Sequence, residues 1–167
     1  MVMEAPEQAE FVREHLGPAL ARAGLGNVEV FCWDHNCDRM EYALAVLADP
    51  EARRYLSGSA WHLYAGEISA LAAVHAAHPD MKLYFTEQWV GSDGQFGPDL
   101  LWHARNVLIG SLCNWSAAVF EWNLASDPWC GPHTDGGEAR CVGALTIGDG
   151  ISRNVAYYVI AHAAQFV

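Results

Sequence analysis

Residues 81–91 read Met-Lys-Leu-Tyr-Phe-Thr-Glu-Gln-Trp-Val-Gly, an apolar run that ends in a carboxylate at Glu87. Other apolar runs end in polar or aromatic clusters in the same way, at 28–36, 59–64 and 117–123. Each run is followed by a stretch of helical character or by a long loop. The repeating unit is therefore a strand, a cluster of polar and aromatic side chains, and a helix.

Nearly continuous apolar strands separated by helices are typical of a parallel sheet that helices cover. Because parallel crossovers are right-handed, four such units curl in one direction and form either half of an eight-stranded barrel or a small open α/β sheet. Carboxylates and aromatic side chains at successive strand ends favour the barrel, whose chemistry lies on the loops after its strands. The expected fold class is α/β, a (βα) half-barrel of TIM type with four parallel strands and helices outside.

The chain is expected to begin with a helix at 6–25, followed by a first strand at 28–34. Further helices are expected at 38–48, 66–77, 99–112 and 152–166, and a fourth strand near 116–122. The loop 123–150 is long enough to indicate a function, and a short strand is expected on it at 142–147. Because the chain has no linker and no low-complexity tract, residues 1–167 are expected to form a single domain.

The composition excludes several classes of protein. Twenty acidic against nine basic side chains give a formal net charge of −11, which disfavours binding to nucleic acid and to anionic membranes. Apolar stretches are too short to span a membrane, and residues 1–6 lack the basic start and apolar core of an export signal. The compartment is left open by the sequence.

The five cysteines do not form a disulfide framework. Free thiols are expected, with Cys130 and Cys141 as the one plausible bridge. Cys32 and Cys37 enclose His35, but their spacing is not that of a zinc site. Phosphate-binding, dinucleotide-binding and serine-hydrolase motifs are also lacking, so no metal and no cofactor is expected.

Glu87 is the strongest candidate for a catalytic residue. By the period of two along a strand, Leu83, Phe85 and Glu87 share one face, so the acid would extend a line of core side chains to the mouth of the barrel. The alternative is a salt-bridged or solvated Glu at a strand end. His62 and Tyr64 end the preceding strand, where both could hold the carboxylate ionised and oriented. Their alternative is a satisfied core histidine and an interfacial tyrosine.

Aromatic and amide side chains at the other strand ends are consistent with a sugar pocket. Trp122 and Asn123, with Trp89 after Glu87, offer flat apolar faces and an amide, and stacking on Trp with polar groups at the hydroxyls is how a pocket holds a sugar. Asp34, on the predicted face of Val28, Val30 and Cys32, is either a pocket wall or a helix cap.

Four segments together resemble family 30 of the glycoside hydrolases, the glucosylceramidase group, over essentially the whole chain. They are Phe85-Thr-Glu-Gln-Trp-Val-Gly91, Trp33-Asp-His-Asn36, Trp61-His-Leu-Tyr64 and Phe120-Glu-Trp-Asn-Leu124 with Gly131-Pro132. The resemblance implies that Glu87 is the nucleophile of a retaining β-glycosidase, that Trp122 stacks on the sugar and that His62 and Tyr64 support the nucleophile. His133 falls where the family commonly has an Asn that contacts the sugar. Relatives are often secreted or lysosomal.

One family feature is missing from this chain. The family's general acid/base is a Glu in an Asn-Glu-Pro type motif on the strand before this chain's first helix, and no such motif occurs here. Asp34 and Glu121 are the candidates within the chain for a second carboxylate. The implied substrate is a β-glucoside or a glycosylceramide, and the alternative is an inactive sugar-binding or assembly module. The open edges of a half-barrel predict a homodimer or a complementing half-barrel as partner.

Overall fold

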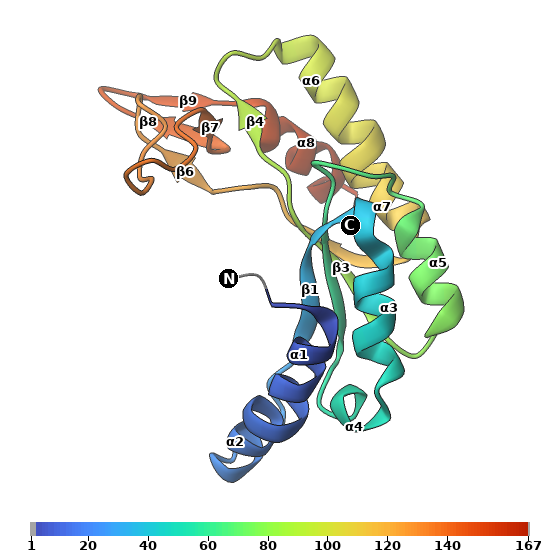
Figure 1. The fold of residues 1–167 in the computed structure, drawn as a ribbon. Helices are drawn as coiled ribbons and strands as arrows, with labels where there is room; N and C mark the ends of the chain where they lie inside the picture. Colours follow the sequence, from blue (N-terminus) through green and yellow to red (C-terminus); the bar gives the residue numbers. More distant parts are fainter. Residues whose placement is uncertain (1–2, 167) are drawn as a thin grey trace.

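The computed structural model describes residues 3–166, and a four-stranded parallel sheet forms its centre (Figure 1). The strands lie in the order β1-β2-β3-β5, which is also their order along the chain. Their bounds are β1 Phe31–Asn36, β2 Gly58–His62, β3 Lys82–Glu87 and β5 Ser116–Val119. The predicted α/β arrangement with four parallel strands is confirmed.

Helices connect the strands and lie on one side of the sheet (Figure 1). The chain begins with a continuous helix made of α1, η1 and α2, in which η1 is a π-type segment. Helices α3 and α5 lie along the sheet, and α6, η3 and α7 form the long helix before β5. The bounds are α1 Ala5–Glu10, η1 Phe11–Leu16, α2 Gly17–Arg22, η2 Cys37–Arg39, α3 Met40–Ala48, α4 Pro50–Arg53, α5 Ala70–Ala77, α6 Phe96–Trp102, η3 His103–Ile109, α7 Gly110–Cys113 and α8 Val155–Ala164.

Short strands occupy the segment after β5, where a long loop was expected. The antiparallel pair β4 and β7 joins Val90–Gly91 to Cys141–Val142. The three-stranded sheet β6-β8-β9 is formed by Ala125–Ser126, Leu145–Ile147 and Ile151–Arg153. This segment therefore folds over the carboxyl ends of the central strands (Figure 1).

The main core lies between the sheet and its helices. Helix α3 buries Val46 and Leu47, which pack with Leu83 and Phe85 of β3 and with Trp61 of β2 in one cluster. Each such side chain stabilises the fold by about 1.5–3 kcal/mol when fully buried. Where the structure describes the chain, no helix has the length and apolarity needed to cross a membrane.

The first strand is shifted along the chain from its predicted place. It was expected at 28–34 and is observed at Phe31–Asn36. The amide of Val28 donates to the carbonyl of Leu25, so these residues turn the chain after α2 instead of pairing with β2. The fourth strand is shorter than expected and ends at Val119.

Candidate active site

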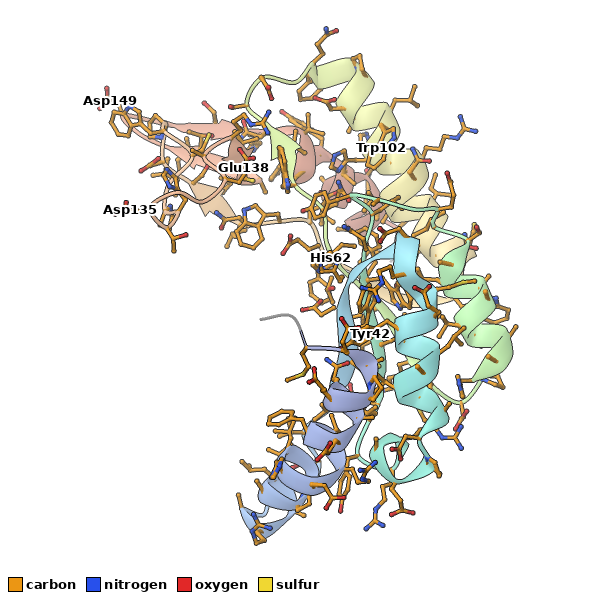
Figure 2. All side chains as sticks on the ribbon, viewed as in Figure 1. Tyr42, His62, Trp102, Asp135, Glu138 and Asp149 are labelled. Carbon is orange, nitrogen blue, oxygen red and sulfur yellow. The ribbon has the colours of Figure 1, made fainter. Side chains whose placement is uncertain are left out.

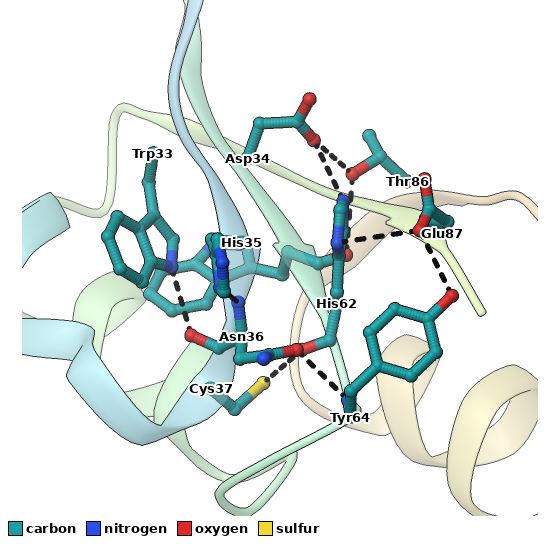
Figure 3. Close-up of polar contacts among 10 residues, drawn as sticks. Trp33, Asp34, His35, Asn36, Cys37, His62, Tyr64, Thr86 and Glu87 are labelled. Atoms are coloured by element: carbon teal, nitrogen blue, oxygen red, sulfur yellow. Dashed lines mark hydrogen bonds and ion pairs between the residues drawn. The ribbon is translucent and has the colours of Figure 1, made fainter. Parts of the chain in front are cut away.

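Polar side chains converge where the central strands end. Asp34 lies in β1, His62 ends β2, Glu87 ends β3, and Tyr64 lies two residues after the end of β2 (Figure 3). Because the strands are parallel, their carboxyl ends meet at one edge of the sheet, where the active sites of TIM barrels are found. The predicted grouping of Glu87, His62 and Tyr64 is thus present in the structure.

Tyr64 connects Glu87 to the backbone of the following loop. Its hydroxyl donates to Oε1 of Glu87 at 3.0 Å and accepts from the amide of Trp89 at 3.0 Å. Burial raises the pKa of the Tyr64 phenol, and the charge of Glu87 raises it further. The phenol therefore keeps its proton and directs it at the carboxylate.

His62 lies between two carboxylates. Its Nε2 is 3.2 Å from Oδ1 of Asp34, and its Nδ1 is 3.9 Å from Oε1 of Glu87. The hydroxyl of Thr86 donates to the same oxygen of Asp34 at 2.7 Å. The hydrogen bond from His62 and the one from Thr86 hold the pKa of Asp34 below its usual value, although partial burial opposes them. Asp34 is therefore an ionised partner of His62.

Two register shifts in the sheet determine the side to which Asp34 and Glu87 point. Asp34 is an extra residue in the pairing of β1 with β2, and Thr86 is an extra residue in β3 opposite β2. An extra residue changes the side of the sheet to which the following side chains point. The expectation that Glu87 shares a face with Leu83 and Phe85 is therefore wrong.

The faces of the two strands differ as a result. Leu83 and Phe85 lie in the core under the helices, whereas Glu87 lies beside His62 on the opposite face. Asp34 likewise does not share the face of Cys32, which is buried in that core. The helix that follows β1 has Asn36 at its start, so Asp34 does not cap it.

A cavity of about 400 Å³ opens beside Glu87 and is bordered by aromatic side chains. Trp89, Trp122 and His133 line it. The amide of Trp122 donates to the carbonyl of Gln88, which holds the tryptophan close to the loop after β3. The remaining lining residues are Cys130, Pro132, Thr134, Gly137, Glu138 and Cys141. A carboxylate beside two tryptophans suits a sugar ring.

Comparisons with known proteins identify the family. The model of the glycosyl hydrolase family 30 TIM-barrel domain matches residues 1–167. The chain belongs to glycosyl hydrolase family 30. An endo-1,6-beta-D-glucanase of Aspergillus fumigatus is 37% identical over 96% of this chain, and a putative glucosylceramidase 2 of Caenorhabditis elegans is 31% identical over all of it.

A solved structure of the same family extends this likeness to the fold. The endo-beta1,6-glucanase BT3312 superposes with a TM-score of 0.91 at 35% identity, covering 98% of this chain and 39% of that one. The chain spans about a third of the length of the relatives named above, 32% and 34%. The family 30 barrel is therefore represented here by a part of it, which confirms the half-barrel prediction.

Asn123 and Glu121 do not join the pocket of Glu87. Both line a second, mainly apolar cavity of about 540 Å³ between the end of β5 and α8. Asn123 has a φ of 62°, so the chain turns there. Glu121 is buried and accepts from Nδ1 of His103 at 2.9 Å. This placement does not support the prediction that Asn123 contacts the sugar. Glu121, a candidate for the second carboxylate, also lies outside the pocket of Glu87.

Glu138 is an acid of the pocket that the sequence did not point to. It lies beyond the strand ends, in the region that also carries Asp135, whereas His62 lies at the strand ends (Figure 2). Arg140 donates to both of its carboxylate oxygens, from Nε at 2.8 Å and Nη2 at 3.0 Å. These contacts hold the pKa of Glu138 below its usual value. Glu138 is thus an ionised partner of Arg140.

The cysteines and possible metal ligands complete the site. Cys130 and Cys141 both line the pocket as free thiols, so the bridge suggested between them is not formed. Over residues 3–166, no group of three or more His, Cys, Asp or Glu side chains is arranged to hold a metal ion. Thr86 stands within the segment 85–91 but was not singled out as a site residue, and Cys141 was considered only as half of a possible disulfide.

Proposed function

We propose that this chain carries the nucleophile of a retaining β-glycosidase and that Glu87 is that nucleophile. The observation that carries the proposal is the hydrogen bond from Tyr64 to Glu87 at the end of β3, beside a cavity lined by Trp89 and Trp122. Membership of a glycosyl hydrolase family supports it. In a retaining glycosidase the carboxylate attacks the anomeric carbon, the bond to the leaving oxygen breaks, and water later hydrolyses the ester.

The two oxygens of Glu87 have different surroundings. The hydroxyl of Tyr64 and Nδ1 of His62 both face Oε1. We therefore assign the attack to Oε2 and the stabilisation of the carboxylate to Oε1. When the ester is hydrolysed, the electron pair of the broken bond returns to Glu87, and the Tyr64 proton is already in place to stabilise it.

Retention also needs a second carboxyl group, roughly 5–5.5 Å from the first. Asp34 is paired with His62 and Thr86, Glu121 is buried against His103, and Glu138 is paired with Arg140. None of these acids is placed as a free proton donor. We propose that a complementing half of the barrel supplies the general acid, on the same polypeptide or on another.

The substrate we propose is a β-linked glucan with β-1,6 bonds. Three relatives named endo-1,6-beta-D-glucanases are 37%, 34% and 31% identical to this chain, and four relatives named glucosylceramidases are 27–31% identical. A glycosylceramide is the competing substrate. Both present a β-glucoside to Glu87, but a glucan continues as further glucose units on either side of the broken bond, whereas a glycosylceramide carries a ceramide at the leaving oxygen.

A sugar-binding or assembly module without turnover is the second candidate. The observation that favours it is the engagement of Asp34, Glu121 and Glu138 in other contacts. The two candidates differ in protonation of the leaving group, since general acid help contributes about 10²- to 10⁴-fold. A chain that carries only the nucleophile should react with aryl glucosides whose leaving group needs no proton.

The test is trapping with an activated 2-fluoro β-glucoside, followed by intact mass and peptide mapping. The expected result is one label on Glu87, and no label on the Glu87→Gln variant. The matched control is Glu51→Gln, an exposed position on α4, which should label like the parent. Absence of label together with binding of glucose-containing ligands would establish the module instead.

Competition during trapping tests the substrate. A β-1,6-linked gluco-oligosaccharide should slow the labelling of Glu87 at lower concentration than micellar glucosylceramide does. The reverse order would assign the glycosylceramide. This measurement needs no general acid, so it can be made on the chain as it stands.

A further inference from the structure

Strained backbone brings Asp34 to the site. Trp33 has a φ of 74° and Asp34 a φ of 54°, so two successive residues other than glycine adopt the left-handed conformation. Such a conformation is strained for residues other than glycine and is found where surrounding structure holds it in place, often at functional sites. The strain coincides with the extra residue that turns Asp34 toward His62.

Two donors from neighbouring strands meet at one oxygen of Asp34. Nε2 of His62 in β2 is 3.2 Å from Oδ1, and the hydroxyl of Thr86 in β3 is 2.7 Å from it. Thr86 is itself the extra residue of its strand. The two extra residues, Asp34 and Thr86, thus contact each other, and with His62 they link β1, β2 and β3 at the carboxyl end of the sheet (Figure 3).

Asp34 determines how the imidazole of His62 is oriented. Because the ionised carboxylate accepts only, the nitrogen that faces it carries a proton, and in the neutral ring that nitrogen is Nε2. Nδ1 then faces Oε1 of Glu87 at 3.9 Å. The ring of His35 lies nearly parallel to that of His62, with centroids 6.2 Å apart, and Tyr64 lies edge-on to it.

Asp34 is not among the residues that line the cavity of Glu87. Its carboxylate is taken up by His62 and Thr86, so a sugar ring beside Trp122 would meet Glu87 and not Asp34. Asp34 is therefore not a wall of this pocket, as one interpretation of the sequence had it, and any effect it has on Glu87 passes through its neighbours. The relation of Asp34 to His62 and Glu87 is that of a carboxylate that orients an imidazole beside a reacting group.

We propose that Asp34 is a positioning residue that acts on Glu87 only through His62, by fixing the tautomer and orientation of the ring. This inference rests on the proposed role of Glu87 as nucleophile. It predicts that removing the carboxylate frees the imidazole to rotate and to exchange its tautomer. The ring then no longer has a fixed position beside Oε1 of Glu87, and the carboxylate loses the neighbour that holds it in place for attack.

The experiment compares Asp34→Ala, Asp34→Asn, His62→Ala and the double variant Asp34→Ala with His62→Ala. One measurement is the ¹⁵N shifts of the His62 ring, which report the tautomer without any substrate. The other is the rate at which the activated 2-fluoro β-glucoside labels Glu87. Asp80→Ala, exposed in the turn before β3, is the matched control. Thermal unfolding of every variant shows whether it is folded.

We expect Asp34→Ala to shift the ¹⁵N pattern of His62 and to slow labelling by up to about 10²-fold, the size of effect that a misplaced group produces. Asp34→Asn, which keeps an acceptor, should fall between Asp34→Ala and the parent. In the His62→Ala background, loss of Asp34 should have no further effect, because the two act in series.

Additive losses in the double variant, or an unchanged ¹⁵N pattern in folded Asp34→Ala, would overturn the proposal. If the parent chain itself fails to label at Glu87, the proposed function fails. The ring measurement still decides whether Asp34 orients His62.

Discussion

At the scale of single residues, the hydroxyl of Tyr64 makes two hydrogen bonds, and Tyr64→Phe removes both while keeping the aromatic ring. Tyr64→Phe leaves Oε1 of Glu87 without its donor and the amide of Trp89 without its acceptor. A hydrogen bond to a charged group contributes about 1.5–3 kcal/mol, so departure of the trapped sugar from Glu87, the step that returns the charge, should slow about 10- to 100-fold. The rate at which added azide removes the label from Glu87 measures this. The control is Tyr158→Phe on α8, and equal rates for both variants would contradict the role of the phenol.

Cys141 gives a second residue-scale prediction. Burial raises the pKa of its thiol to about 11, and the nearby charge of Glu138 contributes to the shift. Because the thiolate is the reactive form, Cys141 should resist iodoacetamide near pH 7, whereas exposed Cys113 should react first. Peptide mapping over a pH series measures the order. Since Cys141 lines the pocket, a bound sugar should protect it at high pH, and reaction of Cys141 before Cys113 would contradict the prediction.

At the scale of the elements, two glycines test how closely β2 and β3 must approach. A Cβ on Gly58 would lie 1.8 Å from the carbonyl oxygen of Lys82, whereas a Cβ on Gly97 in α6 would meet nothing within 4 Å. Gly58→Ala should therefore destabilise the fold by about 1–3 kcal/mol or more. Gly97→Ala should be neutral or stabilising by up to about 1 kcal/mol, because alanine favours the helix. Denaturant unfolding compares the pair, and similar midpoints would show that the sheet can relax around the added methyl group.

The buried contact between Glu121 and His103 joins the end of β5 to the long helix. Burial raises the pKa of Glu121 above its usual value, and the hydrogen bond from His103 only partly opposes this. In the folded state Glu121 therefore keeps its proton to a higher pH than in the unfolded state, where a Glu has its ordinary pKa of about 4.3. Stability from this group is fully present below that pH and declines as the pH rises through the folded pKa.

Glu121→Gln removes this decline because the amide does not ionise. Its free energy of unfolding, relative to the parent chain, should therefore increase between pH 4 and pH 7. Chemical denaturation at several pH values measures the difference. A difference that falls with pH would mean that an ion pair with His103 stabilises the ionised carboxylate more than burial opposes it.

Periodicity predicted the order of the elements but not the faces of two strand ends. The runs that contain Phe85 and Trp61 were correctly expected as strands, because their side chains are apolar enough to be buried on the helix side. The extra residues Asp34 and Thr86 break the period of two, and no property of the local sequence marks them. Glu87 does lie beside His62 and Tyr64, although the strand face predicted for it was wrong. The three side chains meet because parallel strands end at a common edge of the sheet. Asn123 was misplaced because its left-handed turn is a tertiary feature.

At the scale of the whole molecule, the sheet has two open edges, β1 and β5. Its face opposite the helices carries the stacked rings of Phe31 and Tyr84, and the apolar cavity of about 540 Å³ lies beside β5. Phe120 at the end of β5 is 51% exposed. Open edges with apolar neighbours favour association, and a barrel removes such edges altogether. The structure therefore has the surfaces that a second half-barrel would cover.

A second copy of the chain is the partner that can be tested directly. We expect a dimer by light scattering at micromolar concentration, and a strictly monomeric mass would contradict it. Because each copy carries a net charge of −11, added salt should strengthen the association by screening the repulsion between copies.

Two matched substitutions locate the interface. Phe120→Asp places a charge at the open edge and should dissociate the dimer. Leu101→Asp, at an apolar position of α6 that is 69% exposed, should leave it intact. Dissociation by Leu101→Asp alone would place the interface on the long helix instead of the barrel edge, and the closing half of the barrel would then have to be a different polypeptide segment.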